Sequence, residues 1–353
     1  MAILRPLAVR AVTLIGVFFV VLLLLVVTLG ATGFSDRTLQ AVVSEEIRGL
    51  RTSLGQSGQI TDPDELERVL LERRGELRRF YDLDRPWYYR LPDTVLRVLT
   101  LDLGEARTLR SFEGSNKVAD IVLERLPNTA ILLTTAFLIT TALGLAVGVY
   151  LATHPGSRLD RITSYFAAVS FALPAWWLGI LLILLLAVQL RIFPSGGMYS
   201  SPPPTASLLR FLDLMAHAAL PVLTLVLVSA GPYIFMVRTM TLNVAQEDHV
   251  TTARAKGVPE SRVMRVHILR VAAPPIVTGL ILGLTGTLGG SILIETVFNW
   301  QGMGRLYFEA VAGTTDEGVI VALTFIFTLL YVVARLVLEV LYVLLDSRVR
   351  YTN

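Results

Sequence analysis

The sequence predicts an all-α membrane protein with six transmembrane helices and a small helical subdomain between the first and the second. One observation is composition: of 353 residues, 54% are hydrophobic and 17% are charged, and the mean hydropathy is +0.63. Soluble domains average about 45–50% apolar and about 25% charged residues. The other observation is that the apolar excess lies in blocks long enough to cross a bilayer, which takes about 20 residues per helix.

The first apolar block, Ala11–Leu29, is 19 residues long and carries no charge. The apolar core of a secretory signal is shorter, at about 7–15 residues. We therefore expect an uncleaved anchor helix, with residues 1–29 forming the cytoplasmic end and the first span. The alternative is a signal peptide that is cleaved near the small residues Ala31–Gly33.

The polar region that follows, residues 30–126, is the expected helical subdomain. Asp62 predicts a helix N-cap, because Pro63 follows at the first helical position and acids fill the first turn. We expect Asp84–Pro86 to stop this helix, and Asn116–Leu126 to form another, amphipathic one. The apolar stripe of the first helix consists of Leu66, Val69, Leu70, Leu77 and Phe80.

Five more apolar blocks make residues 127–353 the membrane core, with a polar loop at about 239–275. Proline is tolerated inside such blocks because neighbouring helices satisfy the freed backbone groups. The expected spans are Thr129–Leu151, Ser164–Leu190 with an interruption at Pro174, Ala218–Val237, Ile276–Phe298 and Val319–Leu345.

Lysine and arginine in short loops mark the cytoplasmic side of a membrane protein. One side has twelve, namely Arg5, Arg10, Arg158, Arg161, Arg238, Arg254, Lys256, Arg262, Arg265, Arg270, Arg348 and Arg350. The other has three, namely Arg191, Arg210 and Arg305. We expect a multi-pass protein of the cell membrane with both termini in the cytoplasm and residues 30–126 outside. The net charge of +3 fits this rule better than nucleic-acid binding.

The polar stretch Arg238–Pro275 separates two of the expected spans. Within it, Glu247–Gly257 reads as a polar helix that ends at a glycine, and a basic amphipathic helix begins near Pro259. Such a helical hairpin is an unlikely passive linker. We interpret it as a surface that receives a partner.

The fifth span is rich in glycine, and residues at GxxxG spacing let helix backbones approach closely. Gly144 and Gly148 give the second span the same spacing. Tight packing inside one subunit, a subunit interface and the lining of a transport pathway all remain open for the fifth span. Glu295, at its end, could line an outer vestibule or cap the next loop. The glycines are Gly279, Gly283, Gly286, Gly289 and Gly290.

Arg335 and Glu339 are four residues apart inside the sixth span. An unpaired charge near the bilayer centre costs about 2.5–3.5 kcal/mol on insertion scales, whereas a pair at this spacing can neutralise itself. We therefore expect an ion pair between them, and a role in a pathway or gate is the alternative.

Catalytic and cofactor motifs are missing from the sequence. It contains no cysteine, its four histidines have no metal-ligand spacing, and it contains no phosphate-binding loop. We expect no catalytic residue, cofactor or metal in this chain. If transport is driven by ATP, the ATPase must be another chain.

The hairpin sequence Ala253–Gly257, with Glu247–Val250 before it and His267–Arg270 after it, resembles the EAA loop of ABC importer permeases. Nearly the whole chain resembles the first permease subunit of the dipeptide/oligopeptide/nickel importer family, which includes the dipeptide permease B subunits. Other matching segments are Asp84–Pro86, Asp102–Gly104, Val118–Asp120, Glu124–Thr129, Leu173–Gly179, Phe193–Gly196, His217, Leu220–Leu225, Glu295–Phe298, Gly302–Leu306 and Leu345–Arg350.

This resemblance implies the type I ABC importer permease fold and a non-catalytic subunit that imports dipeptides or oligopeptides. It implies a heterodimer with a homologous second permease, two cytoplasmic ATPase subunits that hold ATP and Mg²⁺, and an external substrate-binding protein. The polar helix would be the coupling helix on the ATPase. Its residues are Glu247, Asp248, Thr251, Thr252, Ala253, Arg254, Ala255, Lys256 and Gly257.

Two features depart from the family pattern. Thr251 and Thr252 stand where the general motif has Glu-Ala, and the outer region between Gly30 and Tyr81 is longer than expected. Nickel, glutathione or oligosaccharides are alternative substrates of the same architecture. A secondary transporter would predict charged residues at the midplane of several helices, and a receptor or scaffold would leave the hairpin unexplained.

Overall fold

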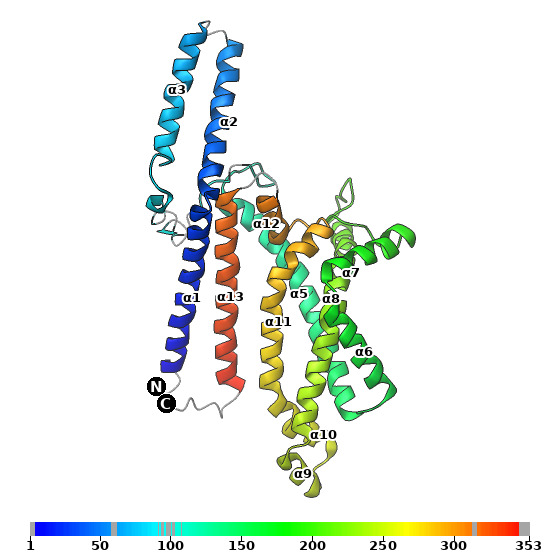
Figure 1. The fold of residues 1–353 in the computed structure, drawn as a ribbon. Coiled ribbons are helices and arrows are strands. Elements are labelled where there is room, and N and C mark those ends of the chain that lie inside the picture. Colours follow the sequence, from blue (N-terminus) through cyan, green and yellow to red (C-terminus); the bar gives the residue numbers. More distant parts are fainter. Residues whose placement is uncertain are drawn as a thin grey trace. The chain divides into compact units, whose positions relative to one another are not determined.

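The computed structural model describes residues 4–57, 62–90, 92, 95, 96, 100, 103–106, 108–312 and 316–345 (Figure 1). The regular structure in these ranges is helical apart from one isolated bridge between Glu105 and Lys117. Asp102, Arg348 and Arg350 lie outside the described residues. The chain forms two compact units: Met1–Val12, Leu123–Phe308 and Leu330–Asn353 make one, and Thr13–Val122 with Glu309–Leu329 makes the other.

Five helical segments of the described chain are long and apolar enough to cross a membrane. They lie in α1 (Leu4–Ala31), α5 (Val118–Thr153), α8 (Ser207–Ala245), the run from α10 (Glu260–Arg262) into α11 (Arg270–Val297), and α13 (Glu317–Leu345). Four of them match predicted spans, and the fifth overlaps the span predicted at Ile276–Phe298 but begins at Glu260, within the predicted polar loop. The protein is therefore a multi-pass, all-α membrane protein.

The segment expected as a third span with an interruption at Pro174 forms two separate helices with a sharp bend between them. Helix α6 (Arg158–Ala172) and helix α7 (Ala175–Leu182) are bent by 104° relative to one another, and α7 continues into the π-helix η2 (Ile183–Gln189). Leu173 between them is extended (φ −86°, ψ 125°), as a residue before proline prefers. The total of six spans holds only if this bent pair crosses as one.

The amphipathic helix expected at Asn116–Leu126 and the second span are one helix, α5, of 36 residues. Pro127 lies inside it and removes one backbone donor without ending it. The boundary that we expected at residue 126 therefore falls within a continuous helix.

The polar region between α1 and α5 contains a helical hairpin of α2 (Phe34–Ser57) and α3 (Pro63–Phe80). Asp62 caps α3 by accepting a hydrogen bond of 3.0 Å from the backbone NH of Asp64, as predicted. The helix ends at Phe80, before the expected stop at Asp84–Pro86, and the Phe80 side chain is exposed. The hairpin core consists of Val43 and Ile47 from α2 and Leu70 and Leu77 from α3.

Helix α8 is the centre of the other unit, and glycines let two helices approach it closely. A Cβ atom on Gly144 of α5 would overlap the Tyr233 ring, and one on Gly148 would lie 2.8 Å from Cβ of Val237. On the α6 side, a Cβ on Gly231 would lie 2.8 Å from Cα of Ala167. The GxxxG pair of the second span is therefore a packing contact within one subunit.

We predict that Gly144→Ala lowers the melting temperature of the detergent-solubilised protein. The new methyl group must displace the Tyr233 ring, and overpacking of this kind costs about 1–3 kcal/mol. The matched control is Gly283→Ala in α11, since a Cβ there meets nothing within 4 Å. Equal melting temperatures for the two variants would contradict the close approach of α5 to α8.

Candidate functional site

The polar stretch between the fourth and fifth spans forms a hairpin at one end of α8 and α11, at the far end of α8 from α7 (Figure 1). Its first helix, α9 (Asp248–Ala255), confirms the predicted polar helix. Gly257 then reverses the chain with φ +73°, a conformation that glycine adopts without strain. The second helix begins at α10 as expected, but it continues through the π-helix η3 (Val263–Leu269) directly into α11. The fifth span and the hairpin are therefore mechanically continuous.

Local interactions hold the hairpin closed. The Val258 NH donates to the Ala253 carbonyl at 3.2 Å, and the Gly257 NH donates to the Arg254 carbonyl at 2.9 Å. Arg254 also forms two hydrogen bonds with Glu260, of 2.7 and 3.2 Å. Through these bonds Glu260 raises the pKa of Arg254.

The hairpin has a buried inner face and an exposed outer face. Val250 and Ala253 of α9 pack with Val263 and Ile268 in one apolar cluster. Ala253 is 6% exposed, so its small side chain serves packing inside the hairpin rather than a surface contact, contrary to our expectation. The exposed positions among the predicted site residues are Glu247, Asp248, Thr251, Thr252, Arg254, Ala255, Lys256 and Gly257.

A cavity of about 290 Å³ lies among α5, α8 and α11. Gly279 and Gly283, two of the glycines that the sequence suggested as pathway or interface residues, line this cavity and differ in their surroundings. A Cβ on Gly279 would overlap the Met236 thioether, whereas Gly283 faces open space. Gly286 and Gly290 belong to α11, but their surroundings lie outside the described part of the chain.

Glu295 is fully buried and joins three segments. Its carboxylate accepts hydrogen bonds from the Thr129 hydroxyl at 2.8 Å and from the Arg305 backbone NH at 3.0 Å. The Thr129 hydroxyl in turn accepts from the backbone NH of Met303 at 2.8 Å. This geometry fits the second interpretation of Glu295, a cap on the loop that leads into α12 (Met303–Ala312).

The prediction of an ion pair between Arg335 and Glu339 is wrong. Glu339 pairs with Arg10 of α1, and the Arg335 guanidinium lies 5.9 Å from the centre of the Tyr331 ring. The sequence spacing could not reveal this, because the competing cation comes from the other end of the chain. Across the ranges that the structure describes, no three His, Asp or Glu residues are grouped to hold a metal ion.

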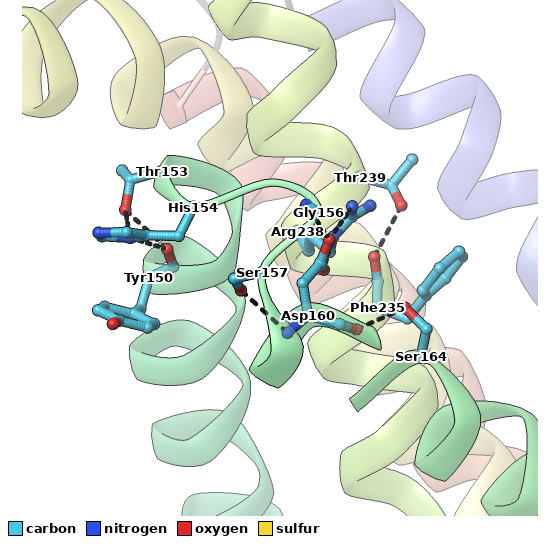
Figure 2. A network of polar contacts seen from close by, with 10 residues as sticks. All are labelled: Tyr150, Thr153, His154, Gly156, Ser157, Asp160, Ser164, Phe235, Arg238 and Thr239. Carbon is cyan, nitrogen blue, oxygen red and sulfur yellow. Dashed lines mark hydrogen bonds and ion pairs between the residues drawn. The ribbon is translucent and has the colours of Figure 1, made fainter. Parts of the chain in front are cut away.

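Sequence reasoning missed an ion pair between Asp160 of α6 and Arg238 of α8 (Figure 2). Asp160 is 4% exposed, although the sequence predicts a short loop before Ser164 and no helix at this position. An available signal was its position three residues after Ser157, since a Ser-x-x-acid pattern is typical of a helix start.

Comparison with known proteins places this geometry in a family. Residues 144–351 match the family described as binding-protein-dependent transport system inner membrane component. The chain is 30% identical to the oligopeptide transport system permease protein AppB of Bacillus subtilis (strain 168), over 77% of this chain and 83% of AppB. It is 32% identical to the di/tripeptide transport system permease protein DppB of Pseudomonas aeruginosa (strain UCBPP-PA14), over 82% and 90%.

The fold itself has a solved counterpart. A chain of the methionine ABC transporter MetNI, in inward-facing conformations, superposes with a TM-score of 0.51 at 18% identity. The match covers 64% of this chain and 96% of that one, and it shows the type I importer permease fold. The family match extends over more than half of the residues and includes the hairpin, Glu295 and the α8 and α11 residues that line the cavity. The chain therefore belongs to the family of binding-protein-dependent transport system inner membrane components.

Proposed function

We propose that this chain is a permease subunit of an ATP-driven importer of dipeptides or oligopeptides, and that α9 and its glycine turn form the coupling helix. The observation that carries the proposal is the exposed polar face of a hairpin whose other face is built into the ends of two spanning helices. The permease relatives AppB and DppB support the peptide substrate.

The proposed assembly has this chain beside a homologous second permease. Two ATPase subunits, which carry ATP and Mg²⁺, lie below in the cytoplasm, and a substrate-binding protein docks outside. The chain itself supplies no catalytic residue. Both termini face the cytoplasm, and residues 30–126 form the outer subdomain, whose α2–α3 hairpin adds contact area for the binding protein.

Force transfer follows from the way in which the hairpin is attached. Helix α8 runs without a break for 39 residues, and only two residues separate its end from the start of α9. On the other side, α10 leads through η3 into α11. A displacement of α9 by an ATPase would therefore be passed to α8 and α11, two of the three helices that line the cavity, which supports a pathway along the α11 glycines.

Lys256→Glu should lower peptide-stimulated ATP hydrolysis of the reconstituted complex several-fold while the permease still inserts and assembles. Lys256 is exposed at the end of α9, so its reversal changes the docking surface without removing a bond within the hairpin. The matched control is Arg262→Glu, an exposed cation on the second helix of the hairpin. Stimulation that is unchanged in Lys256→Glu would count against α9 as the coupling helix.

Gly283→Leu should reduce uptake of a radiolabelled dipeptide by reconstituted vesicles, because the new side chain fills open space beside the cavity. Gly283→Ala adds only a methyl group at the same position and should transport close to the wild-type rate. If Gly283→Leu assembles and transports normally, the cavity is not part of the pathway.

A further inference from the structure

The buried ion pair between Asp160 and Arg238 joins two helices that are far apart in the sequence (Figure 2). Arg238 donates from Nη2 to Oδ2 of Asp160 at 2.7 Å, and its Nε donates to Oδ1. The Asp160 side chain is 5% exposed, and the Arg238 side chain is 19% exposed. Both carboxylate oxygens therefore face the fork of one guanidinium, a geometry that fixes direction as well as distance.

The turn before α6 holds the carboxylate in place. Ser157 caps α6 by accepting from the Asp160 NH at 3.1 Å, and Asp160 accepts from the Gly156 NH at 2.9 Å. These reciprocal bonds follow the logic of a capping box. Gly156 has φ +76°, so the turn also requires glycine. Asp160 thus links the α5–α6 turn, the start of α6 and Arg238.

A second fixed point between the same helices lies seven residues earlier on α8. There Gly231 approaches so closely that an added Cβ would lie 2.8 Å from Cα of Ala167 and 2.9 Å from Oγ of Ser170. Seven residues of helix span about 10 Å. Contact at two points with this separation opposes both sliding and rotation of α6 on α8.

We propose that Asp160 and Arg238 are positioning residues that make α6 move together with α8 during transport. Helix α8 continues from Arg238 to Ala245 and then leads to α9, while α6 leads to the sharp bend before α7. A displacement of the hairpin would therefore reach the broken span through this pair. The inference rests on the proposed coupling role of α9.

Stability alone does not account for this arrangement. A buried ion pair contributes little net stability compared with well-packed apolar residues, because both charges lose their hydration. A bidentate pair does fix one relative orientation of its two helices. A fixed orientation of α6 on α8 is needed if movement is to pass from one helix to the other, whereas holding the helices together does not require it.

The first test uses the full complex in lipid nanodiscs, with the second permease, the ATPases and a binding protein loaded with a dipeptide mixture. Asp160→Asn, Arg238→Gln and the double variant are compared with Arg161→Gln, which removes an exposed charge next to Asp160. The readout is the ratio of stimulated to basal ATP hydrolysis per assembled complex. We expect this ratio to fall at least fivefold in the double variant, which leaves no unpaired charge, and to be unchanged in Arg161→Gln.

The second test measures the movement directly. The chain has no cysteine, so spin labels can be placed at Ile162→Cys on α6 and Phe235→Cys on α8, both exposed positions, with cysteine-free partner subunits. In the otherwise wild-type complex the distance between the labels should be the same in the ATP-free and vanadate-trapped states. In the double variant the distance should differ between the two states or become broad.

The outcomes separate this inference from the proposed function. If the wild-type complex shows no stimulated hydrolysis, the proposed function fails. If the wild type is stimulated and the double variant keeps both its ratio and a constant distance between the labels, the pair is only structural and the positioning role is overturned. A double variant that assembles poorly but keeps the wild-type ratio per complex leads to the same conclusion.

Discussion

The close approach of α5 and α6 to α8 is the constraint on which the larger unit of this protein depends. Lipid chains are as apolar as leucine, so helices in a membrane gain little from burying apolar surface against one another. Association must come from van der Waals contact and from polar links. Gly144, Gly148 and Gly231 provide the contact by removing the side chains that would hold the helices apart.

Polar links then fix the positions that close packing leaves free. Glu295 ties the end of α11 to α5 and to the start of α12, and Asp160 ties the α5–α6 turn to α8. Each carboxylate is buried and accepts hydrogen bonds from at least one other segment, which is how a low-dielectric interior tolerates a charge. Glu295, at the end of α11, and Asp160, at the start of α6, lie toward opposite ends of the bundle (Figure 1). The cavity lies between these two sets of hydrogen bonds.

Much of the fold could be predicted from the sequence, because long apolar runs and helix-capping residues are local signals. Asp62 and Gly257 occupy the predicted conformations for this reason. The sequence predicted less where the outcome depends on partners far along the chain. The spacing of Arg335 and Glu339 suggested a pair, but Arg10 competes for the carboxylate, and Ala253 turned inward because η3 packs on it. Helix α2 was missed although Val43 and Ile47 have helical spacing, because charged residues surround them.

The pairing of Arg10 with Glu339 has a consequence for how the protein is made. The two residues are separated by 329 positions, so Arg10 enters the membrane region long before its partner is synthesised. At about 5–20 residues per second the interval is roughly 15–70 s. During that time the Arg10 side chain can keep its charge in the headgroup region by extending along the helix toward water. The Arg10–Glu339 pair can therefore form only after α13 has been synthesised, so that this link between α1 and α13 is made late in biogenesis.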